Sequence, residues 1–189
     1  MSGKILYIFF GLIASGKSTL AGMFAETHHF PYYNTDRVRK ELAGLQATER
    51  RVDGLRQGIY SPEFTEKTYR KMFDHAQLDL QQGAAGVVLD GSYSKRDDRT
   101  NVITLAEKQD ADTLFILCSC SDKEVKRRLD LRAKDPAAVS DGRWEIFIRQ
   151  KETFEFPDEL RKDQLLQLDT EDDPQQLLIQ VENFCKNRT

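Results

Sequence analysis

A nine-residue segment that begins at Gly11 sets narrow limits on how this chain can fold. It reads Gly-Leu-Ile-Ala-Ser-Gly-Lys-Ser-Thr and fits the pattern G-x-x-x-x-G-K-[ST] of the phosphate-binding Walker A loop. An apolar run, residues 5–10, precedes it, and a helix-like segment, residues 20–26, follows it. Because this motif works only between a strand and a helix, the segment predicts an α/β protein with a phosphate site after its first strand.

The fixed positions of this loop each have a chemical reason. Gly11 ends the strand in a tight turn, and Gly16 lets the backbone approach a phosphate without a Cβ in the way. Lys17 can reach the β- and γ-phosphates of a nucleotide, and the Ser18 hydroxyl can ligate Mg²⁺. The helix N-terminus that follows adds a partial positive charge. The residues that we expect to bind the nucleotide are Gly11, Ala14, Ser15, Gly16, Lys17, Ser18 and Thr19.

Length and composition exclude several other classes of protein. The 189 residues suffice for one well-buried α/β domain, so we expect residues 1–189 to form a single domain. The net charge of −3 gives no sign of a nucleic-acid or membrane partner. No apolar run near the start is long enough to cross a bilayer. The chain has three cysteines, an odd number that cannot all form disulfides within the chain. We therefore expect a cytoplasmic protein with reduced thiols, and its oligomeric state stays open.

Apolar runs alternate with amphipathic segments along the whole chain. The runs that we interpret as strands are residues 5–10, 31–34, 86–90, 113–118 and 165–168. Helix-start signals lie between them, at Ser61-Pro62-Glu63, at residues 94–97 and in the capping box from Ser121 to Glu124. This alternation predicts a three-layer fold, in which a five-stranded parallel sheet is flanked by helices.

Acidic residues follow three of the expected strands, at Asp36, Asp90 and Asp169. Ligands of parallel sheets bind at the carboxyl ends of the strands, so these positions are informative. Asp36 and Arg39 share one face of a helix. In phosphoryl transfer to an alcohol, Asp36 can take the hydroxyl proton, and Arg39 can hold the substrate or the γ-phosphate. The competing interpretation is an aspartate that complements the helix dipole beside a solvated arginine.

Asp90 ends an apolar strand, in the manner of a Walker B element. It can bind Mg²⁺ through water or contact the substrate, and the alternative is an ordinary strand-end turn. Among the basic residues behind it, we expect Arg96, ahead of Arg99, to contact an anion.

A third group of candidate site residues consists of arginines near the end of a helix and in the loop after it. Arg128 and Arg132 share a helical face, and Arg127 lies beside them. A Pro/Ala/Gly-containing loop, residues 133–143, ends at Arg143. Such a flap is typical of a kinase lid, whose arginine contributes about 10³–10⁵ in rate. The alternative for at least one of these arginines is a favourable charge at a helix C-terminus.

Taken together, these residues resemble the P-loop kinases of the adenylate-kinase-like group. The chain is most similar to small AAA-type ATP-binding kinase-like proteins, and polynucleotide kinase, gluconate kinase and zeta-toxin kinases are more distant. The resemblance spans nearly the whole chain and includes the segment from Tyr60 to Tyr69. It implies that the acid of Asp36-x-x-Arg39 activates an acceptor hydroxyl, and that Arg128, Arg132 or Arg143 stabilises the transferred phosphate. It does not imply a ring ATPase, because sensor segments are not evident.

We therefore expect a kinase that uses ATP and Mg²⁺ to phosphorylate a hydroxyl of a small-molecule or nucleotide-like acceptor. Lys17, Asp36, Arg39, Arg128 and Arg132 are the candidate catalytic residues, and Ser18 and Asp90 the candidate Mg²⁺ ligands. The acceptor side is expected at Asp36, Arg39, Tyr60, Asp90 and Arg96, with specificity in residues 44–70. The alternative is a nucleotide-binding regulatory or partner module with slow or no turnover. A nucleic-acid 5′-kinase is disfavoured by the net charge.

Overall fold

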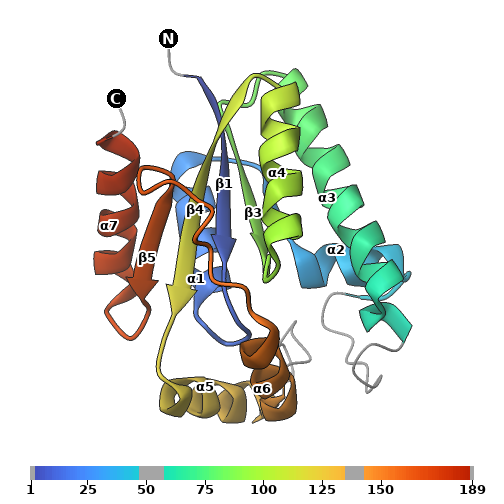
Figure 1. Ribbon diagram of the computed structural model, residues 1–189, viewed down its shortest axis with the longest axis vertical. Helices are drawn as coiled ribbons and strands as arrows, with labels where there is room; N and C mark the ends of the chain where they lie inside the picture. Colours follow the sequence, from blue (N-terminus) through green and yellow to red (C-terminus); the bar gives the residue numbers. More distant parts are fainter. Residues whose placement is uncertain (1–2, 47–57, 135–142, 188–189) are drawn as a thin grey trace.

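The structure, a computed structural model, describes residues 3–46, 58–134 and 143–187. Its centre is a five-stranded sheet in the order β2-β3-β1-β4-β5, in which all neighbouring strands are parallel (Figure 1). The strands are β1 Lys4–Phe10, β2 Tyr32–Asn34, β3 Gly86–Gly91, β4 Ala111–Ser119 and β5 Leu165–Asp169. The predicted parallel sheet is therefore confirmed, and β4 is longer than the expected run of residues 113–118.

Helices cover both faces of this sheet, which makes three layers. The helices are α1 Lys17–His28, α2 Thr35–Leu42, α3 Pro62–Gln81, α4 Arg96–Lys108, α5 Asp122–Lys134, α6 Trp144–Thr153 and α7 Pro174–Lys186, with a short 3₁₀ turn at Gly58–Tyr60. Helices α2, α3 and α4 pack on one face, and α1 and α7 pack on the other. Helices α5 and α6 lie beyond the carboxyl ends of the strands (Figure 1).

The side chains of β1 show why the sheet is buried on both faces. Leu6, Ile8 and Phe10 point into the core beneath α3 and α4, whereas Tyr7 and Phe9 point into the core beneath α1 and α7. Alternate residues of a strand face opposite sides, so a strand between two helical layers must be apolar at every position. The apolar run before the Walker loop is continuous for this reason.

Helix starts agree with the sequence at some positions and differ at others. Ser61 caps α3 as expected, with its Oγ accepting from the Phe64 N–H at 3.2 Å. The N-cap of α4 is Lys95, whose N–H donates to Asp98. The expected capping box at Ser121 is only half formed. Ser121 Oγ accepts from the Glu124 N–H, but the carboxylate of Glu124 binds arginines and the Ser121 N–H donates to Glu171.

Most of the predicted lid, residues 133–143, and much of the predicted specificity segment, residues 44–70, lie outside the described residues. None of the helices in the described part of the chain combines the length and the apolar character that crossing a bilayer requires.

Candidate functional site

The Walker loop has a backbone shape that suits an anion. Ala14 and Gly16 both adopt left-handed conformations, with φ of 58° and 84°. Successive peptides that alternate in handedness turn their N–H groups to one side and form an anion-binding concavity. Gly16 is also the N-cap of α1, which has no side-chain cap and no acid in its first turn. The positive end of the helix is therefore not neutralised by the chain itself.

Side chains around this loop fix its position. A Cβ on Gly11 would lie 2.2 Å from the carbonyl oxygen of Cys118, so only glycine fits beside β4. The Lys17 ammonium donates to the carbonyl of Leu12 at 3.2 Å, which folds the side chain back over the loop. Burial raises the pKa of the Cys118 thiol to about 12, so this neighbour of the loop stays a neutral thiol. The bond to Leu12 therefore holds the Lys17 ammonium at the loop.

Asp90 is fully buried at the end of β3. Its Oδ2 accepts from the Tyr32 hydroxyl at 2.7 Å and from the Asn34 amide at 2.5 Å. Its Oδ1 is buried and has no hydrogen-bond partner in the described part of the chain. Burial and the charge of Asp90 raise the pKa of Tyr32, so the phenol stays a donor. Because an unpartnered buried carboxylate oxygen is costly, Oδ1 marks a place where a water, cation or ligand belongs.

Tyr32 and Asn34 were not among the residues that the sequence singled out. They lie in β2, and its register places Asn34 opposite Asp90. Asn34 also caps α2, because its Oδ1 accepts from the N–H groups of Asp36 and Arg37. The Asn34-Thr35-Asp36 stretch carries an N-cap signal that could have revealed this position, but its contact with β3 depends on strand order.

The pair Asp36 and Arg39 comes together on α2 as the spacing predicted. Arg39 Nη1 donates to Asp36 Oδ1 at 3.0 Å, and the side chains are 9% and 29% exposed, respectively. The Arg39 guanidinium lies 5.0 Å from the ring centroid of Tyr60. Arg39 Nε is buried and, within the described residues, has no acceptor. The solvated-arginine alternative is therefore wrong, since Arg39 is a buried member of this group.

Arg132 and Arg128 lie on the same helix but meet different partners. Burial lowers the pKa of Arg132, Arg128 lowers it further, and Asp36 and Asp90 act in the opposite direction. The charge of Arg132 therefore lies within electrostatic reach of both acids. Arg128 instead donates to Glu124, Ala14, Cys120 and Thr170. The structure thus gives Arg128 protein partners in place of the predicted phosphate contact.

Arg96, the predicted anion contact, has carboxylate partners in the protein. Arg96 pairs with Asp158 at 2.5 Å and is 54% exposed. Arg99 is fully buried, and it pairs with Glu159 and donates to the carbonyl of Tyr93. Both arginines are held by the segment after α6, because that segment crosses the start of α4 and supplies carboxylates that the sequence pattern did not reveal. Arg143 is exposed at the start of α6.

The predicted Mg²⁺ ligands lie near the carboxyl ends of neighbouring strands, β1 and β3. Ser18 is in the first turn of α1, after β1, and Asp90 lies opposite Phe9 of β1. The described residues contain no group of three or more His, Cys, Asp or Glu side chains that could hold a metal ion by themselves. A cation here would need oxygen ligands from a bound phosphate, which is the usual way in which proteins hold Mg²⁺.

A cavity of about 290 Å³ opens beside the Walker loop. It lies between the start of α1, α5 and the start of α7, and its lining includes Gly16, Thr19, Arg128, Arg132, Thr170 and Leu177. Guanidinium and aliphatic side chains line the same hollow, and Gly16 connects it to the phosphate loop. A hollow with both apolar and charged lining is typical of a small-ligand site.

Comparison with known families adds to this geometry. The family described as AAA domain matches residues 6–157, which include the Walker loop, Asp36, Asp90 and Arg132. The chain belongs to this AAA domain family. No curated protein matches the sequence significantly.

The three solved structures of similar fold that follow are kinases by name. A putative kinase from Chloroflexus aurantiacus is 18% identical, with a TM-score of 0.71 over 97% of this chain and 99% of that one. A gluconokinase from Sinorhizobium meliloti is 16% identical, with a TM-score of 0.64 over 98% and 93%. The APS kinase of Mycobacterium tuberculosis, solved with AMPPNP and APS, is 18% identical, with a TM-score of 0.65 over 97% and 98%. These likenesses establish the P-loop kinase fold that the sequence predicted.

Proposed function

We propose that this protein is an ATP-dependent kinase that transfers the γ-phosphate of Mg–ATP to a hydroxyl of a small-molecule acceptor. The observation that carries the proposal is the buried Asp90 carboxylate with one unpartnered oxygen, between the Walker loop and Asp36. The strand order supports it, because β3 lies between β1, which leads into the Walker loop, and β2, which leads into Asp36.

On the donor side, Lys17 and the loop N–H groups hold the β- and γ-phosphates. The base of the nucleotide occupies the cavity beside Gly16 and Leu177. Ser18 and Asp90 would hold Mg²⁺, which offsets the charge of the phosphates when bound. The unpartnered Asp90 Oδ1 fits that role.

On the acceptor side, Asp36 accepts the proton of the acceptor hydroxyl. The hydroxyl oxygen forms a bond to the γ-phosphorus as the bond to the ADP oxygen breaks, so ADP leaves with the electron pair. Arg39 fixes the Asp36 carboxylate through their ion pair. Arg132 places positive charge near both acids and stabilises the transferred phosphate.

The test is a metabolite-and-nucleotide acceptor screen with ATP labelled at the γ-phosphate. Asp36→Ala should lower acceptor-dependent turnover by about 10²–10⁴, the usual contribution of a general base, and leave ATP affinity near wild type. Lys17→Ala should weaken ATP binding itself. Asp74→Ala, which removes an exposed acid of α3, is the matched control and should change neither.

The outcomes separate the alternatives. If ATP binds but no acceptor raises turnover, the kinase proposal fails and the protein is a nucleotide-binding regulatory or partner module. Phosphorylation of 5′-hydroxyl oligonucleotides in the same panel would overturn the small-molecule assignment.

A further inference from the structure

Among the side chains that contact the Walker loop from outside, Arg128 of α5 and Thr170 after β5 hold two of its carbonyl groups. Thr170 Oγ1 lies 2.6 Å from the carbonyl oxygen of Ser15, which is the shorter of its two possible donations, the other being to Ser119 at 3.0 Å. Arg128 Nη1 donates to the carbonyl of Ala14 at 3.2 Å. The two side chains also bond each other, since Arg128 Nη1 lies 3.0 Å from Thr170 Oγ1 and Nη2 donates to the Thr170 carbonyl. We call this pair the Arg128–Thr170 clamp.

The clamp determines the direction of a loop N–H group through peptide geometry. A trans peptide is planar, so its C=O and N–H point to opposite sides. The carbonyl of Ser15 points at Thr170, and the N–H of Gly16, in the same peptide, therefore points away from Thr170. The carbonyl of Gly16 is already occupied by the N–H groups of Thr19 and Leu20. Releasing the Ser15 carbonyl would let this peptide rotate and remove a donor from the concavity.

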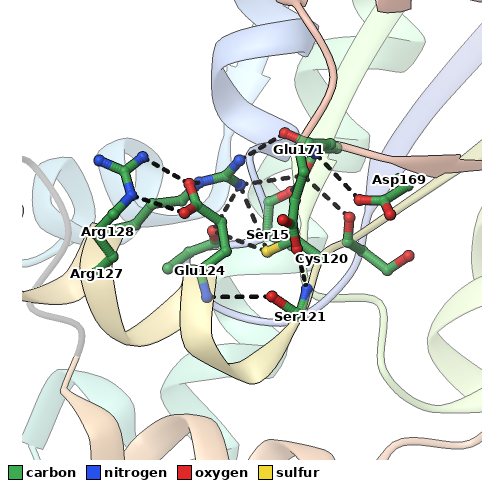
Figure 2. Close-up of polar contacts among 11 residues, drawn as sticks. Ser15, Cys120, Ser121, Glu124, Arg127, Arg128, Asp169 and Glu171 are labelled. Carbon is green, nitrogen blue, oxygen red and sulfur yellow. Dashed lines mark hydrogen bonds and ion pairs between the residues drawn. The ribbon is translucent and has the colours of Figure 1, made fainter.

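The clamp itself is anchored and closely packed. Arg128 Nε donates to Glu124 at 2.7 Å, and Glu124 also binds Arg127. Figure 2 shows Arg128, Glu124 and Ser15 gathered in one network, with Glu171 bonded to Ser121 beside them. A Cβ on Gly16 would lie 3.0 Å from both Arg128 and Thr170, so the loop packs directly against the clamp.

We propose that Arg128 and Thr170 are positioning residues that hold the Walker loop in its phosphate-binding shape. They act on bound phosphate through the backbone of Ala14 and Ser15. The proposal rests on the proposed function, because it takes the loop to be the site of the nucleotide phosphates. It assigns Arg128 a different role from the transition-state contact that the sequence suggested.

The test measures the binding of ADP and of inorganic pyrophosphate to the full-length protein. Arg128→Lys keeps the charge but loses the planar fork. It should weaken both ligands by about tenfold, which corresponds to ~1.4 kcal/mol. Thr170→Val should weaken both ligands similarly, and Thr170→Ser, which keeps the hydroxyl, should restore binding. Arg127→Lys changes an exposed neighbour whose partner among the described residues is Glu124 and should leave both affinities unchanged.

Three outcomes would overturn the proposal. Unchanged ADP and pyrophosphate affinities with slower turnover would make Arg128 a transition-state contact. Loss of ADP affinity with unchanged pyrophosphate affinity would make it a contact of the base. Lower thermal stability with both affinities unchanged would leave a purely structural role. Failure of wild type to bind ADP would instead contradict the proposed function, so the two failures are distinguishable.

If the clamp works as one unit, the double variant Arg128→Lys/Thr170→Val should lose less affinity than the two single losses combined. Residues that share one network are not additive, whereas independent sites are. Fully additive losses would show that Arg128 and Thr170 act separately and would contradict the clamp.

Discussion

At the residue scale, the burial of Asp90 lowers the stability of the fold at a position that belongs to the candidate site. Its carboxylate is fully buried, its two donors, Tyr32 and Asn34, are neutral, and one oxygen has no partner within the described residues. Burying a charge with incomplete hydrogen bonding costs free energy. A side chain that costs stability in this way is characteristic of functional sites, where stability is traded against activity.

Asp90→Asn should separate these two effects. The neutral amide costs less to bury, so the melting temperature should stay equal or rise. The strengthening of ATP binding by Mg²⁺ should be lost, because Asn is a poorer ligand for a hard cation. The measurements are thermal unfolding and ATP titration with and without Mg²⁺. Asp169→Asn, at the exposed end of β5, is the control, and an equal loss of the Mg²⁺ effect there would contradict the assignment.

At the scale of elements, α5 is stabilised by a carboxylate between two arginines. Arg127 and Arg128 both bind Glu124, at spacings of three and four residues. The hydrogen bond from Arg127 is the largest cause that holds the pKa of Glu124 at about 2, well below its ordinary 4.5, and Arg128 adds to it against the cost of desolvation.

This shift predicts how stability depends on pH. Below pH 4.5 the unfolded chain takes up a proton at Glu124 that the folded chain does not bind until about pH 2. The stabilisation is therefore fully present above pH 4.5 and is lost as the pH falls toward 2. Glu124→Gln should be less stable than wild type at pH 7, and the gap should narrow by pH 3. Urea unfolding from pH 3 to 7 tests this, with the exposed Glu152→Gln as control; a constant gap would contradict it.

Within the described residues, three ion pairs attach the segment after α6 to α4, and the two shortest differ in burial. In the third, Arg96 Nε lies 3.7 Å from Glu159. Glu159 binds Arg99, which is fully buried, whereas Asp158 binds Arg96 where both side chains are more than half exposed. The Glu155 N–H also donates to the carbonyl of Ser94. This segment therefore ties α6 to the loop after β3.

Substitutions of the neighbouring residues Glu159 and Asp158 should lower the free energy of unfolding by very different amounts. Glu159→Ala leaves Arg99 as a buried charge without its carboxylate and should lower the free energy of unfolding by about 3 kcal/mol. Asp158→Ala removes an exposed pair, leaves Arg96 with Glu159 and should cost less than about 1 kcal/mol. Chemical denaturation of both variants checks this, and equal costs would show that burial does not decide the strength of these pairs.

At the scale of the whole molecule, the carboxyl edge of the sheet collects the candidate site. The Walker loop, Asp90 and Asp36 follow three adjacent strands, and α5 brings Arg132 toward them. A ligand that binds this edge contacts several elements of the folded state and none of the unfolded chain.

ADP should therefore stabilise the protein against heat. At an ADP concentration of 100 times Kd the gain is about 2.7 kcal/mol, which for a chain of this size raises the melting temperature by roughly 5–10 °C. Lys17→Ala should lose most of this shift, and Asp36→Ala should keep it, because Asp36 serves the acceptor side. Differential scanning fluorimetry gives the result, and an equal shift in Lys17→Ala would contradict the donor-site assignment.

Much of the fold could be predicted from local pattern. The strand and helix periods, the Walker loop and the cap at Ser61 depend on residues close in the chain, where steric and hydrogen-bonding rules act directly. The hydrogen-bond partners of Asp90 could not be predicted in this way, because Tyr32 and Asn34 reach it only through the order of the strands in the sheet. Thr170 was likewise overlooked as a loop contact, since β5 lies far from the Walker loop in sequence.

The amino-acid pattern by itself determined that this chain has a parallel sheet with a phosphate loop after β1 and acids at the strand ends. Those properties follow from local backbone sterics and from the alternation of apolar residues. Only the tertiary structure decided which arginine serves which partner. Arg96 and Arg99 meet Asp158 and Glu159, Arg128 meets the Walker loop backbone, and Arg132 is left near Asp36 and Asp90. A long cationic side chain is drawn to whichever oxygen atoms the fold brings within its reach, and no spacing in the sequence specifies those atoms.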